Sequence, residues 1–467
     1  MARKTDTKTS SELRQSAGRA GLPHVLATAV TRRLALRGFS AAALVAAAAP
    51  AFAETNPSWA EQIFGRPIST STQSADEIRK KAEAPDDLRP NAVPYRSEAM
   101  VEAMESAITR YKIIADRGGW PLIPGVKMLR PEDEDERTPI LRRRLQVSGE
   151  LKDTGNNRGY DGALEEAVKV FQLRHGLRVS GRVDKITLAS LNVPVQTRIE
   201  QLKLNLSRIR ELMVGRVEDR YILVNPPAFQ LEAVEKDEVQ QRHRVIAGRV
   251  ERQTPIVKAT VRALNFFPLW HVPDSVATLD LIPKMRKDPD YIIREKIRVL
   301  ARDFNGPELD PSKVDWETVT ASQIKFRQDS GPQDALGLMR IDMPNSEGVY
   351  MHDTPLKPLF QQRSRAFSAG CVRVQDVFKL GEWIARNEIG WEKPGRVESV
   401  IEVGQPLDLT LTRPIPVYFT YITAWAEPGG AIEFRPDVYG RDGVPTLVAG
   451  RERDENEPPP PPQSLAP

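Results

Sequence analysis

The hydrophobic pattern of this chain changes its period near Arg220, and this change constrains the fold more than any other feature. Before that point, apolar residues recur every three or four positions, as in amphipathic helices. After it, residues 221–225 form the apolar run YILVN, which is typical of a buried strand, and residues 417–422 (VYFTYI) have the same character. We therefore expect an α+β protein, and its 467 residues leave room for two or three domains.

The part of the chain before Arg220 predicts helices with polar residues at their starts. Ser97 precedes an amphipathic stretch that runs to Arg117, and Asp161 and Asp184 each precede a shorter one. Side chains of this kind accept hydrogen bonds from the first free amides of a helix. The expected units are a helical N-terminal scaffold region at 54–135, a small three-helix domain at 138–195 and a connecting helix at 196–216.

The part after Arg220 predicts a mostly β domain at 218–410. Its strand pattern is interrupted at about 270–325 by helical and polar sequence, which we interpret as a helical lid insertion. A C-terminal strand region is expected at 411–451. Residues 452–467 contain five consecutive prolines, so we expect a disordered tail there.

Residues 1–53 have the order of a secretory signal. The pair Arg32-Arg33 precedes an apolar run from Gly38 to Ala49, and Ala51-Phe52-Ala53 has the form of a cleavage site. The paired arginines favour a twin-arginine export signal. We expect cleavage after about Ala53 and a periplasmic location, with an uncleaved anchor as the alternative.

Export changes the charge of the chain. Residues 1–53 hold eight of the 67 Lys and Arg residues and two of the 63 Asp and Glu residues, so the remainder has a net charge of −2. No basic stripe remains of the kind that binds phosphates, so nucleic acid is not an expected partner. The sequence also has no metal-binding His and Cys spacing and no nucleotide loop, so neither metal nor cofactor is expected.

The chain has a single cysteine, Cys371, which has no intramolecular disulfide partner. Composition alone leaves two interpretations, a buried structural thiol or a reactive one. The preceding Ser368-Ala369-Gly370 favours the second, because this small flexible turn lets a substrate approach and offers backbone N–H groups to an oxyanion. His352 is the expected base and would lower the thiol pKa as an imidazolium partner.

Other residues near these two have expected supporting roles. Ser368 is expected to shape the turn, and Tyr350 is a substrate-binding candidate. Arg373 would either bind a substrate carboxylate or brace the loop, and we favour bracing. Asp353 follows His352 directly, and adjacent residues of a strand point to opposite faces. We therefore expect a backbone carbonyl, and not Asp353, to orient the imidazole.

The stretches around His352 and Cys371 resemble the catalytic domain of the L,D-transpeptidases over about residues 220–410. The family pattern is a histidine, a short spacer and S/T-H-G-C with an arginine two residues further on. Here the spacing from His352 to Cys371 is nineteen, and Arg373 is in place. One residue departs from the pattern, because Ala369 replaces the second histidine. Larger periplasmic members of the family also lack it, which leaves His352 as the base.

A second resemblance concerns residues 160–192, which are similar to the peptidoglycan-binding domain found beside many wall enzymes. The matching features are Phe171-Gln172, Gly176-Leu177, the turn at Gly181 to Asp184, and Leu188 with Leu191. Whether this copy still binds the cell wall is left open, since such domains also serve as spacers.

The resemblance implies a reaction. Cys371 would attack a peptidoglycan tetrapeptide stem, release D-Ala and pass the acyl group to an amine. The acceptor would be a second stem, an outer-membrane protein, a lipoprotein or a free D-amino acid, and a carbapenem would act as a covalent inhibitor. The alternatives are an L,D-carboxypeptidase with the same site, a non-catalytic wall-binding scaffold, and a papain-like protease, in which the Cys would precede the His.

Overall fold

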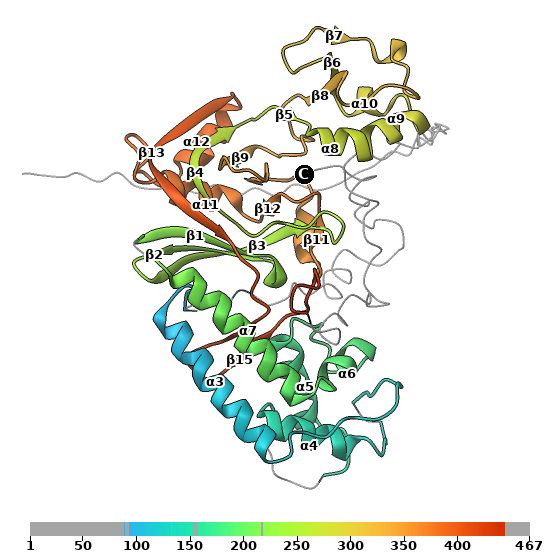
Figure 1. Cartoon of the computed structure of the whole chain (residues 1–467), viewed down its shortest axis with the longest axis vertical. Helices are drawn as coiled ribbons and strands as arrows, with labels where there is room; N and C mark the ends of the chain where they lie inside the picture. The colour runs from blue at the N-terminus through green and yellow to red at the C-terminus, as the bar shows by residue number, and fades with distance from the viewer. Residues whose placement is uncertain (1–87, 89–92, 132, 153–156, 216–217, 444–467) are drawn as a thin grey trace, which may run out of the picture. The chain divides into compact units, whose positions relative to one another are not determined.

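A computed structural model describes residues 88, 93–131, 133–152, 157–215 and 218–443 of the protein (Figure 1). The expected export signal and the Pro-rich tail lie outside these residues, as do residues 54–87 and 89–92 of the expected scaffold region. Within the described ranges, no helix combines the length and the apolar character that a membrane crossing requires.

Two long helices confirm the helical periodicity before Arg220. Helix α3 spans Glu98–Asp116 and helix α7 spans Val195–Met213, and the two lie side by side in Figure 1. Ser97 caps α3 as predicted, since its side chain accepts a hydrogen bond from the Met100 amide at 3.2 Å. The buried faces of both helices share a hydrophobic cluster with one face of the strand that follows. The connecting helix therefore attaches the scaffold to the β domain.

The region between these helices forms the predicted three-helix module. Its helices are α4 (Thr138–Ser148), α5 (Gly162–Arg174) and α6 (Lys185–Leu191). The Asp161 carboxylate accepts from the Leu164 amide at 2.9 Å, and that of Asp184 accepts from the Thr187 amide at 2.7 Å. Both caps agree with the sequence prediction. The module encloses its own hydrophobic core.

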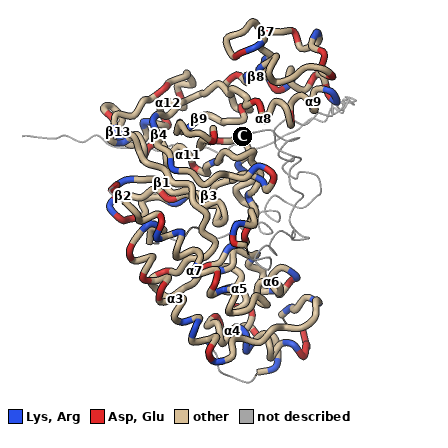
Figure 2. The backbone as a smooth tube through the Cα atoms, viewed as in Figure 1, with Lys and Arg blue, Asp and Glu red and all other residues tan. Residues whose placement is uncertain are grey.

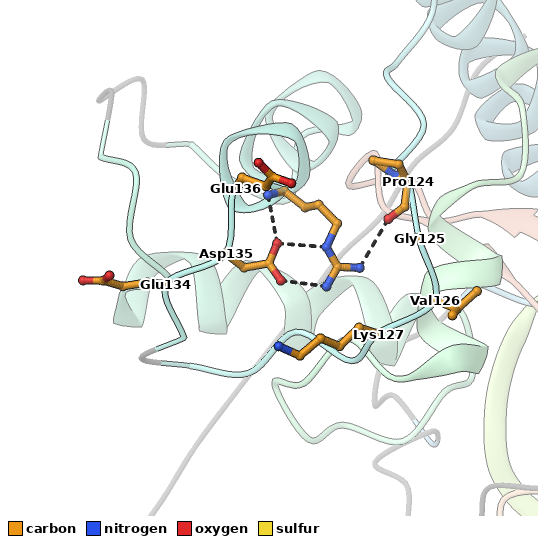
Figure 3. Close-up of a pocket in the computed structure, with 8 residues that line it drawn as sticks. Pro124, Gly125, Val126, Lys127, Glu134, Asp135 and Glu136 are labelled. Carbon is orange, nitrogen blue, oxygen red and sulfur yellow. Dashed lines mark hydrogen bonds and ion pairs between the residues drawn. The ribbon is translucent and has the colours of Figure 1, made fainter.

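The acidic segment before α4 is held by one arginine. Arg137 forms a two-point ion pair with Asp135, with bonds of 2.8 and 2.7 Å, and donates a third bond of 3.2 Å to the carbonyl of Pro124 (Figure 3). These groups line an open pocket of about 430 Å³ together with Lys127 and Glu134. Figure 3 shows the Asp135 carboxylate paired with the Arg137 guanidinium.

A nine-stranded mixed sheet forms the centre of the β domain, in the order β11-β3-β12-β10-β9-β4-β13-β1-β2. Strand β3 also pairs with β2, so the sheet closes on itself. The strands span Arg220–Asn225 (β1), Gln230–Glu235 (β2), Glu238–Gly248 (β3), Val257–Phe266 (β4), Met339–Asp342 (β9), Met351–His352 (β10), Ala366–Ser368 (β11), Val372–Val374 (β12) and Leu407–Phe419 (β13).

Strand β13 corrects one predicted boundary. The expected end of the β domain at residue 410 falls inside this strand, which pairs with both β4 and β1 in the middle of the sheet. The sequence predicted the end of this strand, from Val417, but not its continuity with the main sheet, because Pro414 and Pro416 precede Val417 and proline is normally excluded from central strands. The structure accommodates them with a register shift between Thr410 and Ile415. Helices α11 (Val377–Ala385) and α12 (Arg396–Val403) pack with this sheet's main hydrophobic core.

The predicted insertion is present, and it contains a small sheet as well as helices. Its four strands pair in the order β5-β8-β6-β7, from Trp270–His271 (β5) through Ile297–Ala301 (β6) and Glu308–Leu309 (β7) to Ile324–Gln328 (β8). Its helical turns are α8 (Asp274–Val276), the π-turn η2 (Ala277–Leu281), α9 (Ile282–Lys287) and α10 (Tyr291–Arg294). We call residues 270–328 the lid insertion.

The short strands β14 (Ala424–Ala426) and β15 (Ile432–Phe434) form a separate pair after the main sheet. Their apolar residues join the cluster that contains α3 and α7. Along the described chain, Lys and Arg alternate with Asp and Glu and no stripe of one sign is seen (Figure 2). This distribution agrees with the near-neutral charge derived from the sequence.

Candidate active site

Cys371 lies in the turn between β11 and β12. The Ser368 hydroxyl donates to the carbonyl of Cys371 at 2.5 Å and accepts from the Gly370 amide at 3.2 Å. Gly370 has a φ of +127°, in a region that side chains avoid, while a Cβ there would meet nothing closer than 3.7 Å. The turn therefore needs glycine for its backbone conformation. Ser368 holds the turn in shape, as the sequence suggested.

His352 lies on the strand next to the cysteine. Strands β10 and β12 are parallel neighbours in which His352 is in register with Arg373 and Met351 with Val372. The Val372 amide also bonds to the Tyr350 carbonyl at 3.0 Å. Because side chains alternate along a strand, this register sets His352 and Cys371 on the same face of the sheet. His352 is completely buried.

Tyr350 links the two predicted catalytic residues. Its ring meets the His352 ring edge to face, with centroids 5.7 Å apart and an interplanar angle of 64°. Tyr350 also lowers the pKa of the Cys371 thiol through its backbone and its side chain. The sequence named Tyr350 only as a substrate-binding candidate. The structure adds its ring contact with His352 and its influence on the thiol.

The thiol is nevertheless neutral in the unliganded site. Burial raises the pKa of Cys371 to about 12, and Tyr350 and Arg373 only partly offset this effect. The sequence predicted that an imidazolium partner, His352, lowers the thiol pKa, whereas in the structure the thiol pKa is raised. The difference arises because Cys371 is 4% exposed, so the thiolate would lose its hydration.

Arg373 is completely buried next to the cysteine. Burial lowers the pKa of its guanidinium to about 9, and the nearby Cys371 sulfur acts in the opposite direction. A fully buried side chain favours the bracing role over contact with an incoming substrate. Its charge also lies where it stabilises a thiolate.

Two carboxyl groups lie beside the histidine strand, that of Asp353 directly after it and that of Asp334 in a separate turn. The Asp353 carboxylate accepts from the Leu338 amide at 3.1 Å and pairs with Lys357. It is thus occupied by other partners, in line with the expectation that it does not orient the imidazole. Asp334 lies near Asp353 and is almost completely buried. Burial raises its carboxyl pKa to about 8, so the group is protonated at neutral pH.

Sequence reasoning missed Trp270 and Asp334. Trp270 belongs to the hydrophobic cluster against which Tyr350 packs, and the Asp334 carboxyl contributes to raising the pKa of the Tyr350 hydroxyl. Trp270 comes from the first strand of the lid insertion and Asp334 from the turn that follows it. No sequence pattern marks either residue as part of the site.

The other described histidines have structural surroundings. His175 stacks on Phe171 with centroids 3.8 Å apart, and its Nδ1 lies 2.8 Å from the Phe171 carbonyl oxygen. His243 is bonded through both ring nitrogens, to the Gln375 carbonyl and the Gln241 side chain. His271 is exposed and meets Phe304 edge to face. Among the described residues, no group of three His, Cys, Asp or Glu side chains is arranged to hold a metal.

Comparison with protein families finds a match over the part of the chain that holds these residues. Residues 219–404 match the family described as the L,D-transpeptidase catalytic domain (YkuD). This range contains the Cys371 turn, the His352 strand and the lid insertion. Residues 219–404 are an L,D-transpeptidase catalytic domain. Residues 135–191 match the family described as "Putative peptidoglycan binding domain", and they coincide with the three-helix module.

A curated relative covers part of the same region. A Haemophilus influenzae protein described as "Putative L,D-transpeptidase" is 34% identical over 222 residues, which is 47% of this chain and 44% of the relative. The chain therefore matches less than half of that protein's length. The similarity supports the L,D-transpeptidase domain and does not extend to the whole relative.

Solved structures of the same type have low similarity. An L,D-transpeptidase from Mycobacterium smegmatis is 12% identical, covers 43% of this chain and 58% of its own, and has a TM-score of 0.20. One from Stackebrandtia nassauensis is 12% identical, covers 62% of this chain and 96% of its own, and has a TM-score of 0.24. The assignment of residues 219–404 does not depend on these structures.

Proposed function

We propose that this protein is a cysteine-dependent acyltransferase that acts on peptidoglycan stem peptides. The observation that carries the proposal is the arrangement of Cys371, Tyr350 and His352 at neighbouring positions of adjacent strands, with the Tyr350 and His352 rings in contact. Thiol acyl transfer needs a nucleophile, a base and donors for an oxyanion. The L,D-transpeptidase domain supports the stem peptide as the substrate class.

The first half of the reaction forms a thioester. The Cys371 sulfur attacks the carbonyl that joins the stem to its terminal D-Ala, and the thiol proton passes to His352. The resulting oxyanion accepts from backbone N–H groups of the Gly370–Cys371 turn. Since Ser368 already engages the Gly370 amide, the Cys371 amide is the better placed of the two. His352 then gives the proton to the leaving amine as the C–N bond breaks.

The second half returns the free enzyme. An acceptor amine attacks the thioester carbonyl and gives its proton to His352, and the C–S bond breaks to restore the thiol. The resting thiol is neutral, so proton transfer to His352 accompanies attack and does not precede it. Burial of the site also keeps water from the thioester, which favours an amine acceptor over hydrolysis.

Product analysis tests this function and its alternative. The purified protein would be incubated with tetrapeptide-containing muropeptides and the products separated by mass. Crosslinked dimers identify a transpeptidase, and exchange with an added D-amino acid identifies the same acyl transfer to another amine. Tripeptides alone would identify an L,D-carboxypeptidase. A product pattern that Cys371→Ala leaves unchanged would reject the proposal.

The cellular setting is part of the proposal. Export through residues 1–53 would deliver the enzyme to the periplasm, where the stems are found. The three-helix module is proposed to hold the catalytic domain near the wall, and an outer-membrane protein or lipoprotein is a further possible acceptor. Fusion of residues 1–53 to a reporter that is active only outside the cytoplasm tests the export step.

A further inference from the structure

The segment after β3 supports the catalytic turn directly. The Arg249 amide donates to the Ser368 carbonyl at 2.9 Å, and the Thr254 hydroxyl donates to the Gly370 carbonyl at 2.8 Å. The segment from Arg249 to Thr254 is therefore bonded to both ends of the Ser368–Gly370 stretch that precedes Cys371. The segment therefore borders the turn that carries Cys371.

Two arginines of this segment hold a carboxylate that belongs to the lid insertion. Asp280 in η2 places one oxygen 2.5 Å from Arg252 Nη1 and the other 3.4 Å from Arg249 Nη2. The Asp280 side chain is 5% exposed, and those of Arg249 and Arg252 are 14% and 13% exposed. Two guanidinium groups thus share one nearly buried carboxylate. The three side chains together carry a net positive charge.

The residues around Asp280 pack beside the catalytic residues. Ala277 and Leu281, at the two ends of η2, belong to a hydrophobic cluster against which Tyr350, Phe367 and Ala369 pack. Tyr350 lies shortly before His352 in the chain, and Phe367 and Ala369 lie shortly before Cys371. The Asp280 ion pairs therefore join the lid insertion to the segment that holds the Cys371 turn.

We propose that Arg249 and Arg252 bind the C-terminal carboxylate of the donor stem, and that Asp280 occupies them in the unliganded enzyme. The inference rests on the proposed function, because the donor stem ends in a D-residue whose carboxylate lies one residue from the attacked carbonyl. Guanidinium groups match the two oxygens of a carboxylate in geometry and charge. Exchange of one carboxylate for another also leaves no guanidinium buried without a counter-ion.

The exchange couples substrate binding to the lid insertion. When the stem carboxylate takes the arginines, Asp280 loses its ion pair, and the insertion moves so that this carboxylate reaches water. When the terminal D-residue leaves, it carries its carboxylate away and Asp280 re-forms the pair. The insertion thus closes over the thioester before the acceptor amine enters.

Alkylation of the only cysteine tests the arginine pair without any need for enzyme activity. Iodoacetate carries a carboxylate and iodoacetamide does not, so the ratio of their rates with Cys371 reports the charge available at the site. Asp280→Asn frees the arginines and is expected to raise this ratio several-fold. Arg252→Gln is expected to lower it. An unchanged ratio in both variants would overturn the proposal.

A matched control comes from the same insertion. Asp274 pairs with Lys325 at 2.6 Å and is 61% exposed in its side chain, away from the segment 249–254. Asp274→Asn removes the same charge from the lid insertion and is expected to keep the ratio of the wild type. A rise equal to that of Asp280→Asn would mean that any loss of negative charge has the effect, and the proposal would be wrong.

Two donors separate recognition from a structural role. With a tetrapeptide that has a free C-terminal carboxylate, Arg252→Gln should raise KM about tenfold, the value of one charge-assisted hydrogen bond. With the C-terminal amide of the same peptide it should leave KM unchanged, and Arg252→Lys should recover part of the loss. Equal losses for acid and amide would overturn the proposal. If the wild type turns over neither donor, the proposed function fails while the alkylation ratio still decides on the arginines.

Discussion

At the scale of single residues, the active site is defined by burial as much as by residue type. Cys371, His352, Arg373 and Ser368 are each exposed by less than 5%, and burial governs the charge of the thiol and of the guanidinium. A thiol in this environment stays protonated until a base accepts its proton. Tyr350 both lowers the thiol pKa and lies in ring contact with His352.

The pH dependence of Cys371 alkylation follows from this environment. Because the pKa of the thiol is about 12, the rate with iodoacetamide should rise about tenfold per pH unit from pH 7 to 10 without a plateau. Removal of the Tyr350 hydroxyl in Tyr350→Phe takes away a bond that lowers this pKa, so the rate should fall at every pH. Mass spectrometry of timed samples measures both. A plateau below pH 8 would show a thiolate in the resting enzyme instead.

The same shift has a consequence for stability. The folded-state pKa of Cys371 lies above its ordinary value of 9.0, so the folded protein binds the thiol proton more tightly than the unfolded one. The corresponding stability is fully present below pH 9 and is lost as the pH rises toward 12. Cys371→Ala should therefore lose less stability than the wild type between pH 9 and 11, as measured by urea unfolding. Parallel curves for the two proteins over this range would contradict the assignment.

Substitution of His352 tests its proposed role as the base that accepts the thiol proton. His352→Asn keeps a polar side chain of similar size and removes proton transfer, so turnover should fall by about 10²–10⁴-fold. Circular dichroism would check that the variant folds. Turnover within a few-fold of the wild type would mean that another group accepts the thiol proton.

At the scale of elements, the catalytic turn depends on the tight segment after β3. A Cβ added to Gly248 would lie 2.2 Å from the Arg252 carbonyl oxygen and 2.6 Å from the Thr254 amide. Both contacts are with backbone, so they are not relieved by a side-chain rotation. The segment that contacts Ser368 and Gly370 thus has its shape fixed by this one glycine.

Gly248→Ala should therefore destabilise the fold by about 1–3 kcal/mol, as overpacking of a close backbone contact does. It should also lower turnover, because the catalytic turn would shift with the segment. Gly162→Ala is the control, since it begins α5 with nothing within 4 Å of the added Cβ. Urea unfolding of both variants would measure the difference. Equal stability of the two variants would refute the predicted clash.

At the scale of the whole molecule, the three-helix module is bonded to the strands that follow the main sheet. Arg174 donates to the Ile432 carbonyl at 2.7 Å and pairs with Glu150 at 2.5 Å, and Arg435 donates back to the Arg174 carbonyl at 3.1 Å. The His175 and Phe434 rings stack with centroids 5.2 Å apart. Residues more than 250 positions apart thus form one buried contact.

Arg174→Ala should destabilise the protein by about 3–5 kcal/mol, because Glu150 would stay buried without its counter-ion. Lys169→Ala on the same helix removes a partly exposed pair with Glu165 and Glu166, and its effect should stay below about 1 kcal/mol. Denaturant unfolding monitored by tryptophan fluorescence gives both values. An equal effect of the two substitutions would mean that the Arg174 contact adds no stability.

The sequence was sufficient wherever a local pattern determines the structure. The caps at Ser97, Asp161 and Asp184, the strand from Tyr221 and the fold class all follow from neighbouring residues, and the structure has them. Local patterns did not predict the first part of β13, whose prolines are tolerated through a register shift. They also did not predict the sheet inside the lid insertion. Both depend on pairing with distant strands.

The candidate site divides in the same way. Cys371, His352 and the glycine turn are recognisable from their spacing, and the register of β10 and β12 sets them on one face. No local sequence pattern marks Trp270, Asp334 or Asp280. Trp270 and Asp280 belong to the lid insertion and Asp334 to the turn after it, so their positions depend on how these parts pack. The raised thiol pKa is also a property of burial, which the sequence alone does not measure.

The mass of the intact protein shows whether Cys371 is the nucleophile of an acyltransferase. The purified protein would be incubated with a carbapenem, which acylates a reactive active-site cysteine. We predict one adduct per chain in the wild type and none in Cys371→Ala, whose fold would be checked by circular dichroism. An adduct that persists in Cys371→Ala, or a wild type that forms none, would contradict the account.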